Sequence, residues 1–389
     1  MAVTIHSNPD EFTPSDNPIV WTFSSDQTGQ ANFSFIVELY IDGVLDSNSQ
    51  VFPEVDNYAH FDAEEKTTGL TPSPSINQTS ISADASNTRL VNIKVYERYG
   101  TPPTNQAFAT SAVVNPFKAC ISNEQMQIWD SDDYKVGFPT SKFLTDLDDI
   151  ISIRTGADYY LSIITDEWAD LTAEIAFKDI TGATVTTHSE PISNVNNFTQ
   201  LMLNLDKMVV DGVLTQLQAD STETVEVYIL RQALNVWSET KIFSINRECG
   251  NRGRHLMWLN HLGGFDQFTF THNDTQTTKT KSNSYRKQFG NWQGTNFVLD
   301  AYNAGDIGYI TTSDDSIELV SNWITQSVQN WLVASSYEGV LVTIQTALET
   351  YSRVTIDTNS YKLEDDFFEE LINVIIKLKL SNARRSPKV

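Results

Sequence analysis

The chain has 389 residues, of which 40% are apolar and 11% aromatic, and its formal net charge is −24. This composition is sufficient for packed cores and excludes a chain that is disordered as a whole. The length exceeds the roughly 250–300 residues at which single cores stop growing, so we expect more than one domain. The two cysteines, Cys120 and Cys249, are too few for a disulfide framework, and we expect both to be small buried thiols.

The charge is unevenly distributed along the chain. Residues 1–249 hold 13 Lys and Arg against 35 Asp and Glu, a net charge of −22, whereas residues 250–389 hold 13 against 15, a net charge of −2. The first region would repel phosphate, so we do not expect it to bind nucleic acid. The chain also lacks a signal peptide and an uncharged apolar run long enough to span a bilayer, which predicts a protein made and kept in a cytoplasm.

Alternating apolar residues predict β-strands in the first segment. Residues 32–41 place Phe and aliphatic side chains on one face, and the Asp42-Gly43 pair that follows is typical of a tight turn. Residues 90–97 predict another strand. Between them, residues 64–88 are rich in Thr, Ser, Pro and Asn, which predicts an extended surface loop or an arm that orders on a partner.

The second segment repeats this order of elements. Residues 171–177 predict a strand, Thr181-Gly182 a turn and residues 224–230 a late strand. Residues 199–219 have apolar side chains at helical spacing and predict one helix. The repetition predicts a mainly β protein with tandem antiparallel, Ig-like β-sandwich domains, at residues 1–118 and 119–248.

The third segment, residues 249–389, predicts a C-terminal mixed β domain with one or two helices. Two aromatic-rich runs flank Gly263-Gly264 and predict a β-hairpin, since glycine tolerates the positive φ of a tight turn. A stripe that includes Trp331 and Leu332 predicts a helix near 317–334. Further strands are predicted at residues 340–344, 353–356 and 373–380.

The hairpin run over residues 258–270 reads W-L-N-x-L-G-G-F-D-x-F-T-F. It resembles a hairpin in virion proteins of tailed phages that infect Bacteroidetes, the crAss-like phages among them. A second similarity concerns the C-terminal modules of the same proteins. It lies in the order of a helix, a strand, the run Val-Thr-Ile-Asp-Thr-Asn-Ser-Tyr at residues 354–361, and a terminal strand. The resemblance is strongest over residues 249–389.

This resemblance implies a virion structural protein, a tail or portal-proximal (connector) ring subunit that forms an oligomeric DNA conduit or attachment platform. It implies sixfold or twelvefold rings of the chain itself, contacts with other virion proteins, and a location in the virion after synthesis in the host bacterial cytoplasm. Genomic DNA would pass along the acidic surface without adhering to it. The alternatives are a carbohydrate- or receptor-binding adhesin or fibre component, and a head-decoration protein.

Local positive charge and exposed aromatic residues predict where subunits meet. The local basic patches are the stretch 279–287 and the C-terminal tail, which holds Lys377, Lys379, Arg384, Arg385 and Lys388; they are either solvated or docked on an acidic neighbour. Tyr and Trp often anchor protein interfaces. The predicted assembly residues are Lys279, Tyr285, Arg286, Trp292, Arg384 and Arg385.

No catalytic motif is recognised, and we predict no enzymatic activity, no cofactor and no metal. His255, His261 and His272 cluster in the sequence but match no metal-binding spacing, so we expect solvent-facing histidines. The run Asp130–Asp133 offers oxygen ligands of the kind that calcium prefers, yet it lacks the glycine and the glutamate of an EF-hand loop.

Overall fold

The computed structural model is mainly β, with several antiparallel sheets and a few helices, which confirms the predicted fold class. It describes residues 3–385 except residues 55, 75, 77–80, 85–86, 137–140, 148–149, 166–170, 193–196, 232–234, 248–252, 273, 288–290, 294, 299–304, 348–349, 358–370 and 382–383. None of the helices within the described residues has the length and apolar character needed to cross a bilayer. Cys249 lies outside the described residues.

The chain divides into two compact units. The first comprises residues 1–247 together with residues 259–266, and the second comprises residues 248–258 and 267–389. The Gly-Gly hairpin is therefore shared: its tip belongs to the first unit and most of its two strands to the second. The division into three domains stays a prediction.

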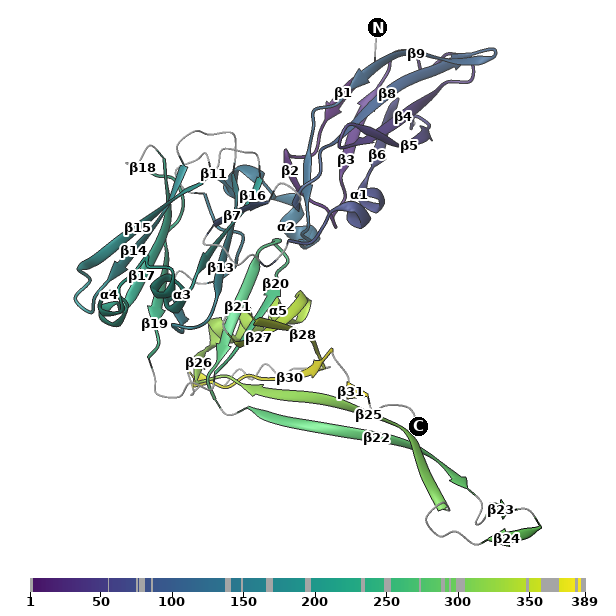
Figure 1. The fold of residues 1–389 in the computed structure, drawn as a ribbon. Coiled ribbons are helices and arrows are strands. Elements are labelled where there is room, and N and C mark those ends of the chain that lie inside the picture. Colours follow the sequence, from purple (N-terminus) through teal and green to yellow (C-terminus); the bar gives the residue numbers. More distant parts are fainter. Residues whose placement is uncertain are drawn as a thin grey trace. The chain divides into compact units, whose positions relative to one another are not determined.

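Two sheets form a sandwich at the N-terminal end of the first unit (Figure 1). The strands of the first sheet are, in spatial order, β1 (Thr4–Ser7), β3 (Val20–Ser24) and β6 (Tyr58–Asp62). Those of the second sheet are β5 (Val44–Val51), β4 (Ser34–Ile41), β8 (Val91–Gly100) and β9 (Pro103–Thr110). Phe35 and Val37 of β4 pack with Trp21 and Phe23 of β3 in one buried core. The turn at Asp42-Gly43 is confirmed, and both residues adopt positive φ values, 51° and 76°.

The prediction of an extended loop at residues 64–88 is wrong. Residues Glu64–Leu70 form the helix α1, and Ile81–Asp84 form the strand β7, which pairs antiparallel with β16 (Asn197–Leu203). Composition alone misled here, because strand addition to a distant sheet depends on the partner strand and leaves little trace in the local sequence.

A second pair of sheets follows in the first unit. The strands of one sheet are, in spatial order, β11 (Lys135–Val136), β13 (Tyr159–Thr165), β16 and β7. Those of the other sheet are β12 (Ile150–Ile153), β19 (Lys241–Ile245), β17 (Thr224–Arg231), β14 (Leu171–Lys178) and β15 (Thr184–Ile192), with β18 (Asn235–Val236) beside β17. Both strands predicted in this segment are confirmed. Tyr159 of one sheet meets Phe243 of the other, with ring centroids 6.2 Å apart, so the two sheets share a core.

The single helix predicted at residues 199–219 is corrected. β16 occupies the start of that range, and two short helices follow, α3 (Leu205–Val210) and α4 (Gln216–Ser221). Asn204 and Thr215 each accept a hydrogen bond from a backbone N–H in the first turn of the helix they precede, and such caps divide the range into separate elements.

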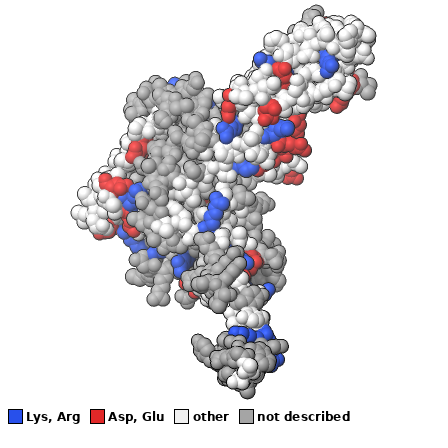
Figure 2. All heavy atoms as spheres, turned by 45° about the vertical axis from the view of Figure 1, so that its right-hand side comes forward, with Lys and Arg blue, Asp and Glu red and all other residues white. Residues whose placement is uncertain are grey.

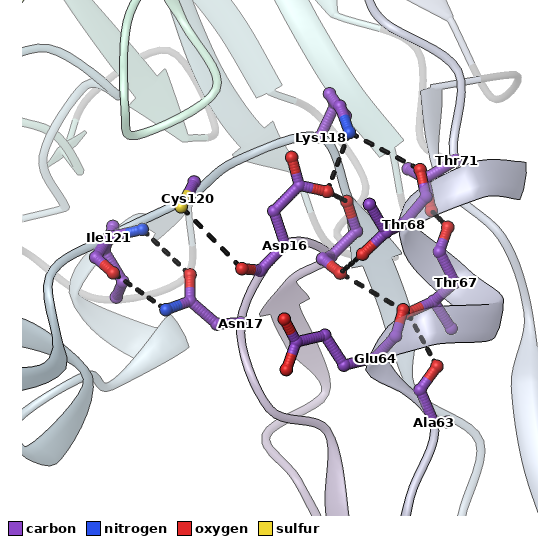
Figure 3. Close-up of polar contacts among 11 residues, drawn as sticks. Asp16, Asn17, Ala63, Glu64, Thr67, Thr68, Thr71, Lys118, Cys120 and Ile121 are labelled. Carbon is purple, nitrogen blue, oxygen red and sulfur yellow. Dashed lines mark hydrogen bonds and ion pairs between the residues drawn. The ribbon is translucent and has the colours of Figure 1, made fainter. Parts of the chain in front are cut away.

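β10 (Asn115–Phe117) pairs with β2 (Phe12–Pro14). The residues that follow these two strands are joined by polar contacts between Asp16 and Asn17 on one side and Lys118 and Ile121 on the other; we call this set the polar joint (Figure 3). The Asn17 side chain donates to the Ile121 carbonyl at 2.7 Å and accepts from the Ile121 N–H at 2.8 Å. Lys118 Nζ lies 2.7 Å from Asp16 Oδ1. Asn17 is buried, so this pair of bonds satisfies polar groups that water does not reach.

Cys120 lies beside this joint and is exposed, contrary to the prediction of a buried thiol. Its Sγ donates weakly to the Asp16 carbonyl at 3.7 Å, and its backbone N–H donates to the His261 carbonyl. The short helix α2 (Asn123–Gln127) follows and begins with a capping box at Ser122. Cys120 is therefore held by its backbone, and the thiol itself remains at the surface.

Within the first unit, the hairpin tip packs closely against the backbone of Leu144 and takes part in a buried polar network. Asn260 donates to the Leu144 carbonyl at 3.0 Å and to Asp266 at 2.9 Å, and Thr145 donates to the same carboxylate at 2.6 Å. Gly263 has a φ of +83°, and a Cβ on Gly264 would lie 2.1 Å from the Leu144 carbonyl oxygen. The Gly-Gly pair thus serves both the turn and this close approach.

One large sheet dominates the second unit. Its order is β21 (Phe265–Phe270), β20 (Arg254–Leu259), β27 (Val340–Ala347), β28 (Thr350–Ile356), β30 (Ile375–Leu380), β25 (Gly305–Val320), β22 (Thr275–Lys287), with β31 (Arg384–Arg385) beside β25. Smaller pairs are β23 (Asn291–Gln293) with β24 (Asn296–Val298), and β26 (Ile324–Thr325) with β29 (Leu371–Ile372). The predicted hairpin and the three predicted strands are confirmed.

The helix of the second unit begins later than predicted. α5 spans Gln326–Glu338, whereas Ile317 and Leu319 belong to β25 and alternate with exposed or half-buried neighbours. Trp323 is 63% exposed and precedes the helix. Leu332 packs in the core, and Ser335 accepts a hydrogen bond from Trp258 Nε1 at 2.8 Å, which fixes α5 against β20.

Candidate assembly interface

β22 and β25 form a long ribbon that extends from the sheet of the second unit, and β25 also pairs with β30 over residues 316–320 and with β31 at Thr312 and Ser313 (Figure 1). The two strands of the ribbon pair antiparallel from Thr275 opposite Glu318 to Lys287 opposite Gly305. At about 3.3 Å per residue, the 13 residues of β22 span about 43 Å. Every residue of β22 except the half-buried Lys287 is exposed, so the ribbon has almost no core of its own along this strand.

The two faces of this part of the sheet differ. Thr278 donates to the buried Asp315 at 2.6 Å, and Ile317 is buried on that same face, so it is continuous with the core. The opposite, solvent-facing side carries lysines from two strands, because residues opposite each other in register share a face. We call this surface the lysine face; its lysines are Lys279, Lys281, Lys377 and Lys379.

The carboxylates of Asp314 and Glu318 also lie on the lysine face, and each forms an ion pair with a lysine of β30. Lys377 Nζ lies 3.4 Å from Glu318, and Lys379 Nζ lies 3.7 Å from Asp314. Figure 2 shows Lys and Arg side chains gathered on the ribbon, near the lower end of that view. The surface therefore carries more positive than negative charge, in a chain that is acidic overall.

All six predicted assembly residues fall on the ribbon, at its end or beside it. Lys279, Tyr285 and Arg286 lie on β22, and Trp292 lies in β23, between the two strands of the ribbon. Arg384 and Arg385 form β31, which pairs with Ser313 and Thr312 of β25. The structure thus brings together residues that are up to 106 positions apart in the sequence, from Lys279 to Arg385.

Alternation along β22 separates two of the predicted residues. Lys279 and Tyr285 share the solvent-facing side, whereas Arg286 stands on the opposite side, across from Asp306. Sequence reasoning treated Lys279 and Arg286 as one patch. Strand period, rather than closeness in sequence, decides which charges act together.

The acidic run at Asp130–Asp133 forms a structural turn. Asp130 Oδ1 accepts from the Asp132 N–H at 2.9 Å, and Lys135 Nζ lies 2.8 Å from Glu11 and 3.5 Å from Asp132. Lys135 thus offsets part of the negative charge of Glu11 and Asp132, and Lys142 Nζ lies 3.6 Å from Asp133. Among the residues that the structure describes, no group of Cys, His or carboxylate side chains is arranged to hold a metal ion.

Two groups around this turn have shifted pKa values. Burial raises the pKa of Asp10, and the nearby charges of Asp130 and Asp132 raise it further against a hydrogen bond from Ser131. Burial, with the negative charge of Asp146, raises the pKa of Tyr134 to about 12. Both shifts disfavour the charged form, as expected where carboxylates are crowded.

The hairpin histidines are not uniformly solvent-facing, so that prediction is corrected. His255 is buried, and its Nδ1 lies 2.9 Å from Thr269 Oγ1. His261 Nε2 lies 3.1 Å from Asp146 Oδ2, and only His272 is exposed. The first two histidines are held in polar contacts of the fold.

A second surface, missed by sequence reasoning, lies on the outer face of the N-terminal sandwich. Tyr96 of β8 and Phe108 of β9 are opposite each other, with ring centroids 5.2 Å apart, and Phe108 is 51% exposed. Lys94 Nζ lies 4.8 Å from the Tyr40 ring centroid. We call Tyr40, Tyr96, Phe108 and Lys94 the aromatic platform. Aromatic residues at the outward positions of β4 and β8 were the available signal.

Glu38 connects the two tyrosines of the aromatic platform. Tyr40 donates to Glu38 at 2.8 Å, and this hydrogen bond is the main cause of the raised pKa of Tyr40. Burial is the main cause of the raised pKa of Tyr96, followed by the charge of Glu38. Both phenols therefore stay protonated at neutral pH, and the Tyr40 hydroxyl donates its hydrogen bond to Glu38.

Comparison with known proteins does not assign the chain to a family. No protein-family model matches the chain, and no curated protein matches it. A solved structure of trypsin-activated alpha-2-macroglobulin from Escherichia coli is similar with a TM-score of 0.18 and 9% identity, over 99% of this chain and 21% of that chain. The chain thus spans about a fifth of that protein's length, and a similarity this low carries no argument about fold or function.

Proposed function

We propose that the chain is a structural subunit of a tailed-phage virion, a ring component of the tail or of the connector near the portal. In this proposal it assembles with copies of itself and with other virion proteins into a DNA conduit or an attachment platform. Its site of action is the virion, and it performs no reaction. The resemblance of residues 258–270 to virion hairpins supports the phage assignment.

The observation that carries the proposal is the exposed ribbon. A two-stranded hairpin alone is marginally stable in water, and β22 buries almost no side chain along its 13 residues. Such an element is well suited to gain order and contact area on a neighbouring molecule. A subunit that must reach its neighbour in an assembly requires an element of this kind.

The remaining architecture fits the same role. Sandwich cores in the first unit give rigid walls, and the net charge of −22 over residues 1–249 would repel the phosphates of passing DNA. Repulsion between exposed charges acts over about 10 Å at 0.1 M salt, so the surface would guide DNA without retaining it.

The proposal is tested by the stoichiometry of the purified chain. Mass photometry and negative-stain images at low and physiological salt should show closed sixfold or twelvefold rings. Trimers would instead support a fibre component. A chain that stays monomeric in both conditions would contradict self-assembly into a ring.

A second candidate function, a carbohydrate- or receptor-binding adhesin, is favoured by the aromatic platform. Aromatic rings stack on the apolar faces of sugars, and the Tyr hydroxyl groups and the Lys94 ammonium can meet sugar hydroxyls. Binding to a glycan array that is lost in Tyr96→Ala/Phe108→Ala would support it. Absence of binding by the intact chain would remove this candidate.

A further inference from the structure

Lys279 and Lys281 lack the carboxylate contacts that the β30 lysines have. Lys279 is directly opposite Asp314, yet the carboxylate of Asp314 is contacted by Lys379. Lys281 is opposite Thr312, which offers no charge. Within the described part of the chain, neither of the two ammonium groups has a carboxylate within 4.0 Å.

These two lysines project in the same direction and are exposed. Residues two apart on a strand point to the same face. Their spacing is about 6.6 Å along the strand, so together they form a short positive edge on the lysine face. Charges placed in this way contribute most to orienting a partner and to the association rate.

The charge distribution of the chain indicates what this edge meets. The ribbon strands also carry Asp306, Asp314, Asp315 and Glu318, and the whole chain has a net charge of −24, so a nucleic acid would be repelled. Two lysine faces would repel each other in a twofold contact. The complementary surface within the chain is the acidic first unit.

We propose that the lysine face of one copy docks on the acidic surface of the first unit of a second copy, with Lys279 and Lys281 as the orienting charges. This inference rests on the proposed function, since it names the partner of the ribbon in the assembly. The contact joins different surfaces of two copies. It therefore propagates head to tail and closes into a ring where the rotation allows.

The contact can be mapped with the intact chain. Isotope-labelled and unlabelled copies are mixed at low salt and joined with a carbodiimide, which links amines to carboxylates in direct contact. We expect labelled-to-unlabelled links from Lys279 or Lys281 to Asp or Glu of residues 3–247. Links confined to single copies, or intermolecular links that avoid both lysines, would overturn the inference.

Matched variants separate this face from a general change in charge. Lys279→Gln/Lys281→Gln and Thr280→Glu/Ser284→Glu alter the net charge equally, on opposite faces of the same strand. We expect the lysine variant to weaken self-association about tenfold, which corresponds to about 1.4 kcal/mol. The control should associate like the unchanged chain, and Lys279→Arg/Lys281→Arg should preserve association.

The outcomes distinguish this inference from the proposed function. If rings form and both charge variants assemble equally well, the ring proposal stands and the lysine face is not the contact. If the links and the variant effect are found but the assemblies are open filaments, the contact stands and the closed ring does not. A chain that stays monomeric at every concentration contradicts both.

Discussion

β4 and β22 both pair antiparallel with their neighbours, but they are stabilised differently. β4 buries Phe35, Val37 and Leu39 in a sandwich core, whereas β22 is exposed along nearly all of its length. β4 is thus held by side-chain burial on one face. β22 is held by backbone pairing and by polar cross-strand contacts such as Ser282 with Thr311, 3.1 Å apart. The comparison shows that β4 contributes to a buried core, whereas β22 is the strand to which we assign the proposed contact.

The largest expected effect separates the two strands directly. Phe35→Ala should lower the free energy of unfolding by about 3–5 kcal/mol, because it removes a fully buried ring. Tyr285→Ala on β22 should lower it by less than about 1 kcal/mol, since the ring is 50% exposed. Urea unfolding followed by circular dichroism measures both. Equal losses would mean that the ribbon is packed like the core.

The hairpin tip should resist even a single added methyl group. Gly264→Ala places a Cβ against the Leu144 carbonyl and should cost about 1–3 kcal/mol of stability. Gly308→Ala on the ribbon is the control, since nothing lies within 4 Å of the position its Cβ would take. Thermal unfolding of the two variants should differ clearly. A stable Gly264→Ala chain would show that the tip does not pack as described.

The polar joint provides a smaller test. Asn17→Ala leaves the buried N–H and carbonyl of Ile121 without partners and should cost about 1–3 kcal/mol. Asn283→Ala, at an exposed position of β22, should change stability by less than about 0.5 kcal/mol. Hydrogen exchange at the Ile121 amide should accelerate in the first variant alone. Unchanged exchange there would contradict the role of Asn17.

The smallest effect concerns pH. The pKa of Asp10 is raised in the folded chain, so the folded state holds this proton more tightly than the unfolded state. Stability should therefore decrease as pH rises from the ordinary aspartate pKa through the raised value. Asp10→Asn removes this loss and should be slightly more stable than the unchanged chain at neutral pH. Lower stability at pH 7 would contradict the assigned cause.

The sequence predicted the elements that are stabilised by local alternation. The Phe and aliphatic alternation of β4, the Asp42-Gly43 turn and the Gly-Gly hairpin were all identified correctly because one strand or turn determines each pattern. β7 was missed because its strand state depends on pairing with β16. The helix was predicted near 317–334, but Ile317 and Leu319 lie in β25, where buried and half-buried residues alternate, and α5 begins only at Gln326.

The candidate interface was predicted in composition but not in geometry. Lys279, Arg286 and Arg385 could be singled out from charge alone. The Thr-rich run of β22 has no apolar period, so neither its strand state nor the pairing of β31 with β25 could be deduced. The register then separates Lys279 from Arg286 and places Lys379 beside Asp314. Such facing relations arise only from pairing between distant segments.

Removal of the ribbon tests the central claim most directly. Thr277 and Ser316 are opposite each other, so residues 278–315 can be replaced by an Asn-Gly turn that leaves β30 and the core of the second unit in place. The account predicts that this shortened chain keeps its unfolding temperature within a few degrees but stays monomeric in mass photometry under conditions in which the full chain assembles. Assembly of the shortened chain into the same particles would contradict the claim that the ribbon is the assembly element.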